Sequence, residues 1–439
     1  MTETATRGGR LRRELSDPLF RNAYALMLNG GLTTVLGAGF WALGPAFYSP
    51  SDFGRNAAMN QAIMFVGGIT MLNFLLIRFI PETARHTRAL VLSAYGLGAA
   101  AAAVVGGGFL LALALWGDGW STFRALSGWG PGLMFLAMAV GWNLWNAMEA
   151  VFTGLRHAGW VPVVNTAWCL LRIALLIPLA ALAPHYGIVL AWYVPVVLVL
   201  IPVNVLVFRR LLPEHTRANQ GRGPRSTHRE IARYLGGGYL GGAFQFAAVS
   251  LVPIVVMTRL PPDTAAYFQI AWVPGMMLDL LALTLSYSLT VEGSFERGRL
   301  AGTTRAALRR TVTLMVPVTV LVIVAAPFAL EVYGHEYATG APLLQILALA
   351  VLPKAVIELY IGALRVQNRT GLIAVLQGVR LAGVLGLVAA LLDPGHLATV
   401  GVAVVAVNLA VALAILPGLR RIIAPAARAS TTDRGRDIS

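Results

Sequence analysis

The chain has 439 residues, of which 57% are hydrophobic and 12% are charged. Soluble domains carry about twice that share of charged residues, so this composition excludes an ordinary water-soluble globular protein. The net charge of +15 would suggest nucleic-acid binding in a soluble chain, but the basic residues here lie in short segments between apolar runs. One cysteine, Cys169, leaves no intrachain disulfide and no cysteine cluster for a metal. We therefore expect a membrane protein with no metal site, no cofactor and no nucleic-acid partner.

Twelve apolar runs are long enough to cross a bilayer, which takes about 20 residues of helix. A basic tail over 1–21 precedes a first half over 22–208, and a basic linker over 209–233 leads to a second half over 234–417 and a tail over 418–439. In chain order the runs cover 22–47, 57–80, 89–115, 131–155, 161–183, 187–208, 234–258, 265–290, 311–332, 341–363, 371–392 and 396–417. The sequence thus predicts an all-α polytopic fold of about twelve transmembrane helices.

The basic residues predict the orientation of these spans, because short cytoplasmic loops are enriched in lysine and arginine. With the N-terminus inside, the inner segments hold 28 of the 34 Lys and Arg residues. The outer loops hold only Arg55, Arg124 and Arg259. Both termini are therefore expected in the cytoplasm. The Ala-, Gly- and Arg-rich composition indicates a bacterium, and so the plasma (inner) membrane of one.

The two halves resemble each other, which indicates an internal repeat. The matched pairs, at a nearly constant separation, are Pro50 with Pro261, Asp52 with Asp263, Glu149 with Glu358, and Arg172 with Arg380. Each half has an even number of spans, so the two repeats should run parallel to each other. This arrangement places a pseudo-two-fold axis along the membrane normal, a common plan among transporters.

Six ionisable residues lie inside the predicted spans, where each costs roughly 2.5–3.5 kcal/mol unless it finds a partner or water. They are Glu149, Arg172, Asp279, Lys354, Glu358 and Arg380. The repeat relates Glu149 and Arg172 to Glu358 and Arg380. Two interpretations remain open for these four: one ion pair that braces each half, or direct contact with a substrate.

Asp279 and Lys354 have no charged counterpart, because the matching positions hold Gly68 and Trp145. A cavity-facing Lys354 would suit an anionic substrate such as a phosphate or pyrophosphate. Asp279 could hold a proton or monovalent cation that drives transport. The alternative is that these two residues simply pair with each other across two helices.

Polar residues on the fourth span form a stripe at helical spacing. The stripe includes Asn143, Asn146 and Glu149, and two interpretations are open: it lines a central cleft, or it makes hydrogen bonds between helices. Arg78, at the inner end of the second span, has two interpretations as well. Its side chain reaches the membrane interface, or it meets headgroup phosphates at a cytoplasmic mouth.

Three segments carry a resemblance to a known family. They are RNAYALMLNGGLTTVLGAGFWALGPAFYSPSDFG over 21–54, LLIRFIPE over 75–82 and EAVFTGLRHAGWVPV over 149–163. These segments, with the plan of six plus six spans, resemble the polysaccharide-biosynthesis flippases of the multidrug/oligosaccharidyl-lipid/polysaccharide (MOP) superfamily. The resemblance implies two six-helix lobes in a V around a central cleft, and alternating access that turns a polyprenyl pyrophosphate-linked oligosaccharide or polysaccharide precursor from one leaflet to the other.

The resemblance also implies cationic residues that meet the pyrophosphate. Arg78, Arg172, Lys354 and Arg380 are the candidates here. No nucleotide-binding motif is present, so a proton, a cation or the membrane potential would drive the step, with Asp279 as the coupling candidate. The implied partners are the polyprenyl-linked glycan, membrane lipid, and a glycan polymerase or glycosyltransferases.

Other classes of protein remain open. Drug/cation antiporters of the same superfamily share the architecture, and a non-transporting, lipid-binding scaffold relative would use the buried charges for structure alone. An enzyme is not expected, because the predicted outer loops are too short to build a catalytic domain and no catalytic residue stands out.

Overall fold

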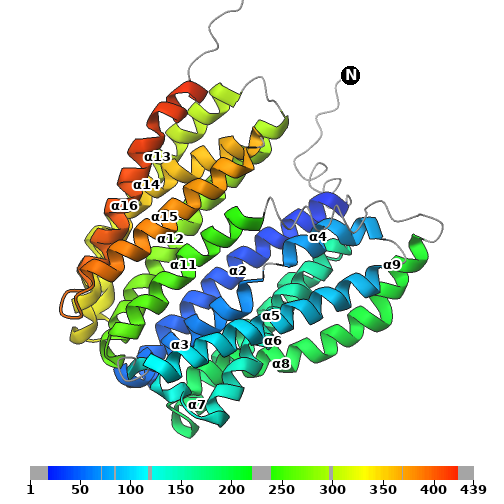
Figure 1. Ribbon diagram of the computed structural model, residues 1–439, viewed down its shortest axis with the longest axis horizontal. Helices are drawn as coiled ribbons and strands as arrows, with labels where there is room; N and C mark the ends of the chain where they lie inside the picture. The colour runs from blue at the N-terminus through cyan, green and yellow to red at the C-terminus, as the bar shows by residue number, and fades with distance from the viewer. Residues whose placement is uncertain are drawn as a thin grey trace, which may run out of the picture.

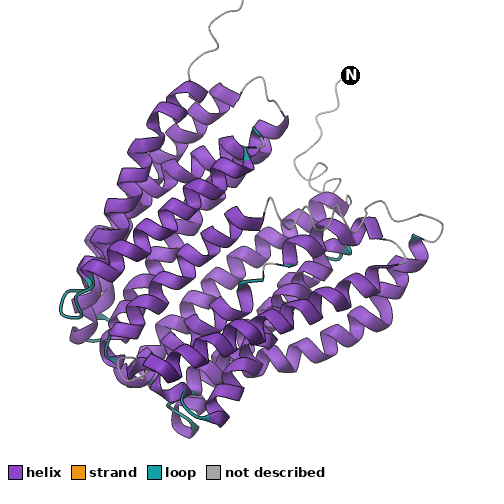
Figure 2. Cartoon of the chain, in the orientation of Figure 1, coloured by secondary structure: helices purple, strands orange, loops and turns teal. Residues whose placement is uncertain are grey.

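The computed structural model describes residues 18–70, 72–83, 86–116, 121–219, 239–295, 300–367 and 369–423. Within these ranges the regular secondary structure is helical, with no strand (Figure 2). The predicted N-terminal tail, most of the predicted linker and most of the C-terminal tail lie outside the described residues.

The described residues of the first half form eight α-helices. They are α2 (Pro18–Phe47), α3 (Pro50–Gly68), α4 (Asn73–Thr83), α5 (Thr87–Trp116), α6 (Trp129–Gly154), α7 (Trp160–Leu182), α8 (Gly187–Leu206) and α9 (Leu212–Ala218). A short 3-10 helix, η3 (Ser121–Leu126), precedes α6, and a π-helical turn, η4 (Val207–Leu211), joins α8 to α9. The sixth span therefore continues past its predicted end at 208, so the linker starts later than expected.

The second half contains six long helices. They are α11 (Tyr239–Arg259), α12 (Pro262–Phe295), α13 (Leu300–Glu331), α14 (Ala341–Val366), α15 (Thr370–Leu391) and α16 (Ala398–Ile423). A 3-10 helix, η6 (His335–Gly340), precedes α14. The last helix extends beyond the predicted boundary at 417.

Each predicted span corresponds to a helix, or to two helices in sequence. Ten helices in the described residues are long and apolar enough to cross a membrane. The spans outside that set are α6 and the pair formed by α3 and α4, whose sequences are more polar. The second span, expected to be continuous over 57–80, is interrupted after Gly68 because Ile69 and Thr70 form a turn. The chain is a multi-pass membrane protein.

The packing of the helices confirms the internal repeat. In the first half α2 packs on α7, α3, α5 and α8 pack on α6, and α7 packs on α8. In the second half α11 packs on α15, α12, α13 and α16 pack on α14, and α15 packs on α16. Span for span, these are the same pairs. Each half is thus one six-span bundle, and the fourth span of each bundle lies at its centre.

The two bundles form a V (Figure 1). They meet where α3 packs against α11 and α12, and they diverge towards the end at which α2 begins and α16 ends. The closed end is tightly packed, because a Cβ atom added to Gly54 would lie 1.7 Å from the carbonyl oxygen of Pro262. The Thr122 hydroxyl also donates a hydrogen bond of 2.6 Å to the carbonyl of Leu260. The protein is therefore closed at one end of the membrane and open at the other.

Candidate functional site

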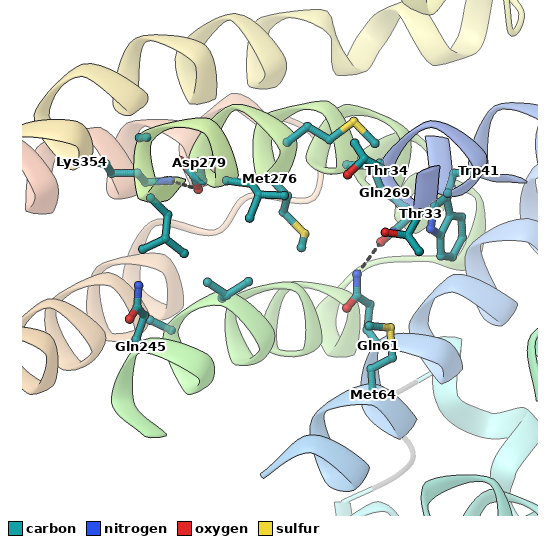
Figure 3. Close-up of a pocket in the computed structure, with 18 of the residues that line it drawn as sticks. Thr33, Thr34, Trp41, Gln61, Met64, Gln245, Gln269, Met276, Asp279 and Lys354 are labelled. Atoms are coloured by element: carbon teal, nitrogen blue, oxygen red, sulfur yellow. Dashed lines mark hydrogen bonds and ion pairs between the residues drawn. The ribbon is translucent and has the colours of Figure 1, made fainter. Parts of the chain in front are cut away.

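A cavity of about 410 Å³ lies between the two lobes. The first lobe contributes residues of α2, α3 and α8 to its walls, and the second contributes residues of α11, α12, α14 and α15. Among the lining residues, Gln61 of α3 and Gln269 of α12 join the lobes, since the Gln61 amide donates to the Gln269 carbonyl at 3.3 Å (Figure 3). The predicted central cleft is therefore present and is built by both repeats.

Lys354 and Asp279 form an ion pair in the wall of this cavity (Figure 3). The Lys354 Nζ atom, on α14, donates to Asp279 Oδ2, on α12, at 2.7 Å. The Lys354 side chain is 10% exposed and that of Asp279 is 32% exposed. The other carboxylate oxygen of Asp279 is buried and has no hydrogen-bond partner among the described residues. The two charges without repeat counterparts thus neutralise each other, and both border the cavity.

Glu358 and Arg380 form a second ion pair, as the repeat predicts for this half. Arg380 Nη1, on α15, donates to Glu358 Oε1, on α14, at 2.8 Å, and both residues border the cavity. Arg380 Nε also donates to Asn408 Oδ1, on α16, at 2.7 Å. This network ties three helices of the second lobe together. The expected ion pair therefore forms in this half.

The corresponding pair in the first half does not form. No nitrogen of Arg172 lies within 4.0 Å of a carboxylate oxygen among the described residues. Its guanidinium instead stacks on aromatic rings, with Cζ 4.1 Å from the centroid of Trp168, 4.3 Å from Trp192 and 5.0 Å from Phe40. The ion-pair interpretation is wrong for this half, because the aromatic rings attract the guanidinium, which is shielded from water.

Glu149 binds neutral groups in place of Arg172. Its Oε1 atom accepts a hydrogen bond from Trp145 Nε1 at 3.0 Å, and the Asn165 amide lies beside the carboxylate. The Asn165 amide also donates to Asn29 Oδ1, on α2, at 3.0 Å. The two charges of the first lobe are therefore held apart, each in its own surroundings.

Arg172 lies behind the cavity wall rather than in it. Gly37 and Trp192 line the cavity, and a Cβ atom added to Gly37 would lie 3.3 Å from Arg172 Nη2. The Arg172 side chain is almost completely buried. One glycine and one indole ring thus separate the guanidinium from the space between the lobes.

The remaining predicted residues lie elsewhere. Arg78 is exposed in the middle of α4 and pairs with Glu82 at 3.3 Å, which places it at the surface and outside the cavity. Asn143 donates to the Gly67 carbonyl at 2.9 Å and to the Thr70 hydroxyl at 2.6 Å, so it joins α6 to the end of α3.

The polar stripe of α6 also borders a side pocket. Asn143 and Asn146 line a cavity of about 250 Å³ that shares Gln61 and Met64 with the central cavity. Asn146 itself donates to the Trp142 carbonyl, one turn earlier in the same helix, at 2.8 Å. Two residues of the stripe thus face a side pocket, and Asn143 also bonds α6 to its neighbour.

Uncharged polar residues of the cavity escaped the sequence analysis. The cavity is lined by two hydroxyls, five carboxamides and two indoles, from Thr33, Thr34, Asn60, Gln61, Gln245, Gln269, Gln377, Trp41 and Trp192. A signal was present, because carboxamides are costly in lipid and five of them interrupt apolar runs. None of these uncharged residues was among the predicted site residues.

No family model and no curated protein sequence matches the chain. Solved structures do match along most of its length. The lipid II flippase MurJ in an inward closed conformation aligns with a TM-score of 0.60 and 11% identity, over 92% of this chain and 89% of that chain. A MOP superfamily transporter from Pyrococcus furiosus, described as having a binding pocket of reverse polarity, gives 0.54 and 16%, over 96% and 99%. The protein MATE in complex with MaL6 gives 0.54 and 15%, over 95% and 98%.

The fold is that of the MOP superfamily transporters. The MOP neighbours include a lipid flippase and a multidrug resistance transporter in an outward-facing conformation. Identities of 11% to 16% establish a shared fold, and the fold serves more than one kind of cargo.

Proposed function

We propose that this protein flips a polyprenyl pyrophosphate-linked glycan across the plasma membrane by alternating access between its two lobes. The observation that carries the proposal is the make-up of the central cavity. It combines two cationic side chains, Lys354 and Arg380, with a wall of carboxamides, hydroxyls and indole rings. A pyrophosphate needs cations, and the ring faces and hydroxyls of sugars suit indoles and carboxamides.

The cations remain available to a ligand although each has a carboxylate partner. A lysine ammonium has three hydrogen-bond donors, and the structure shows one of them bonded, to Asp279. The Asp279 side chain is more exposed than that of Lys354, so the carboxylate lies nearer the open space of the cavity. A pyrophosphate that enters the cavity would compete with Asp279 for Lys354 and leave the Arg380 network in place.

The orientation of the V follows from the charge pattern. Described arginines gather at the open end, including Arg209 and Arg210 after α8, Arg309 on α13, and Arg420 and Arg421 on α16. Because cytoplasmic ends of spans are enriched in arginine, the open end is the cytoplasmic one. The structure then corresponds to a state that receives cargo from the cytoplasm, where lipid-linked precursors would be assembled.

The direct test is complementation of a deletion strain with wild type, Lys354→Ala and the surface variant Arg78→Gln. We expect the deletion to trap lipid-linked glycan on the cytoplasmic side. Lys354→Ala should fail to restore surface glycan, because it removes a buried cation and leaves Asp279 unpaired, whereas Arg78→Gln should restore it. Membrane levels of each variant are measured alongside. If the deletion leaves surface glycan unchanged and sensitises cells to cationic drugs, the drug/cation antiporter alternative is correct.

A further inference from the structure

The repeat provides an internal comparison of two buried carboxylates. Glu358 in the second lobe has a guanidinium at 2.8 Å, supplied by Arg380. Glu149 occupies the matching position in the first lobe, but its matching arginine is held by aromatic rings. One lobe therefore holds a neutral ion pair, and the other holds a carboxylate without a cation.

The helices packed against α6 supply no cation to Glu149 among the described residues. On α7 the nearest polar groups are the Asn165 amide and, further along, Cys169 and Arg172, of which Arg172 stacks on rings. On α4, Arg78 pairs with Glu82 at the surface.

The charged residues on the other neighbours of α6 are exposed at helix ends: Arg88 lies at the start of α5, and Arg124 lies in η3. On α5, the Tyr95 hydroxyl donates to Asn204 at 3.0 Å, and on α8 the Tyr193 hydroxyl is buried without a bonded partner among the described residues. On α3, no acidic or basic residue follows Arg55, which lies at the closed end. Glu149 thus has only N–H donors around it.

Glu149 lies near the end of α6. The residue is only partly buried, whereas its neighbours Met148 and Ala150 are fully buried. It lies five residues before Gly154, the end of α6, which corresponds to a depth of about 7.5 Å. The alternation of antiparallel spans places that end of α6 at the open side of the V.

Contacts through α7 and α2 lead from Glu149 towards the cavity wall. The Asn165 amide lies beside the carboxylate and donates to Asn29 on α2. One turn along α2, the Thr33 hydroxyl donates to the Asn29 backbone carbonyl at 2.7 Å. Thr33 lines the cavity. A change of charge at Glu149 thus reaches a helix that contacts the proposed cargo.

We propose that Glu149 is the proton-binding residue that drives this transporter, in place of Asp279. The inference rests on the proposed transport function, and it assigns the driving ion and its site. In the open state a proton from water adds to a carboxylate oxygen and gives a neutral carboxyl group, and Trp145 loses a charged acceptor. Asp279 is less suited to this role, because Lys354 already supplies its compensating charge.

A proton fits this site better than a metal ion. Both groups that contact the carboxylate present N–H hydrogens, which repel a cation, whereas sodium needs several oxygen ligands. No cluster of three or more His, Cys, Asp or Glu side chains that could hold a metal occurs among the described residues.

The test is infrared difference spectroscopy of the purified full-length protein between alkaline and acidic buffer, with no cargo present. Wild type should show a carboxyl C=O band that Glu149→Gln removes, and the matched control Glu358→Gln should keep that band. Trp145→Phe retains the carboxyl group but should shift the band, which reports on the site even where Glu149→Gln folds poorly.

The proposal is overturned if Glu149→Gln keeps the whole band, or if Asp279→Asn removes it. A band that responds to sodium in place of choline at constant pH would equally overturn the assignment to a proton. The measurement needs no cargo, so failure of the flippase proposal would leave a titrating Glu149 intact. If Glu149 gives no carboxyl band in a protein that still flips glycan, the inference about Glu149 is refuted and the flippase proposal stands.

Discussion

Arg172 shows how the neighbours of a residue decide its role. The repeat predicts an ion pair with Glu149, and the corresponding pair in the second lobe forms. In the first lobe Trp168, one turn before Arg172, presents a ring to the guanidinium at 4.1 Å. The matching position in the second lobe holds Leu376, which offers no such surface. Trp168, with Phe40 and Trp192, thus holds Arg172 away from the carboxylate that the repeat would pair it with.

This account predicts that Arg172→Lys destabilises the protein. A lysine keeps the charge but loses the planar group that stacks on three rings, which should cost roughly 1–2 kcal/mol. Thermal unfolding of the detergent-purified protein should show a lower Tm for Arg172→Lys than for wild type. The control Arg78→Lys, at an exposed pair, should change the Tm little. Equal Tm values for all three proteins would contradict a structural role for the stacking.

At the scale of helices, sequence pattern predicted most of the fold because membrane spans have a defined length. Each of the twelve predicted runs corresponds to a helix or to consecutive helices, and the matched prolines 50 and 261 lie next to the starts of α3 and α12. The break after Gly68 and the extension of α8 into α9 were missed. Both depend on local backbone geometry, a turn at Ile69 and a π-helical turn over Val207–Leu211, that hydropathy does not encode.

The contact between α3 and α12 should control which end of the V is open. Gly54→Ala places a methyl group against the Pro262 backbone, where a Cβ atom would lie 1.7 Å from the carbonyl oxygen. Since backbone cannot give way as a side chain can, the closed end should open. We expect faster labelling from the outside by an impermeant maleimide at Gln269→Cys in a Cys169→Ser background.

Gly130→Ala is the matched control for this prediction, because a Cβ atom at Gly130 meets open space. Its labelling rate should equal that of the parent protein. If Gly54→Ala labels no faster than Gly130→Ala, then the lobes do not separate along this contact, and alternating access in this protein must use another interface.

For the whole molecule, the sequence predicted the architecture better than the site. The two lobes and the cleft were implied by the family resemblance, and the Glu358–Arg380 pair by the repeat. The pairing of Lys354 with Asp279 was one of the two open alternatives. The cavity wall of Gln61, Gln245 and Gln269 was not foreseen, because only folding brings spans two, seven and eight together. The two lobes differ in charge arrangement, which a pattern of repeats cannot reveal, and the difference is the basis for placing the driving proton in the first lobe.

The central claim is that the protein moves a lipid-linked glycan, and reconstitution tests it most directly. The purified protein is placed in vesicles with a fluorescent polyprenyl pyrophosphate-linked saccharide, and an impermeant quencher is added outside. With wild type and Arg78→Gln, the quencher should remove nearly all of the fluorescence, because the labelled lipid reaches the outer leaflet. With Lys354→Ala about half of the fluorescence should remain, as in protein-free vesicles, because the label in the inner leaflet is protected. Protection of that half in the wild-type vesicles, together with uptake of a cationic dye by the same vesicles, would contradict the claim.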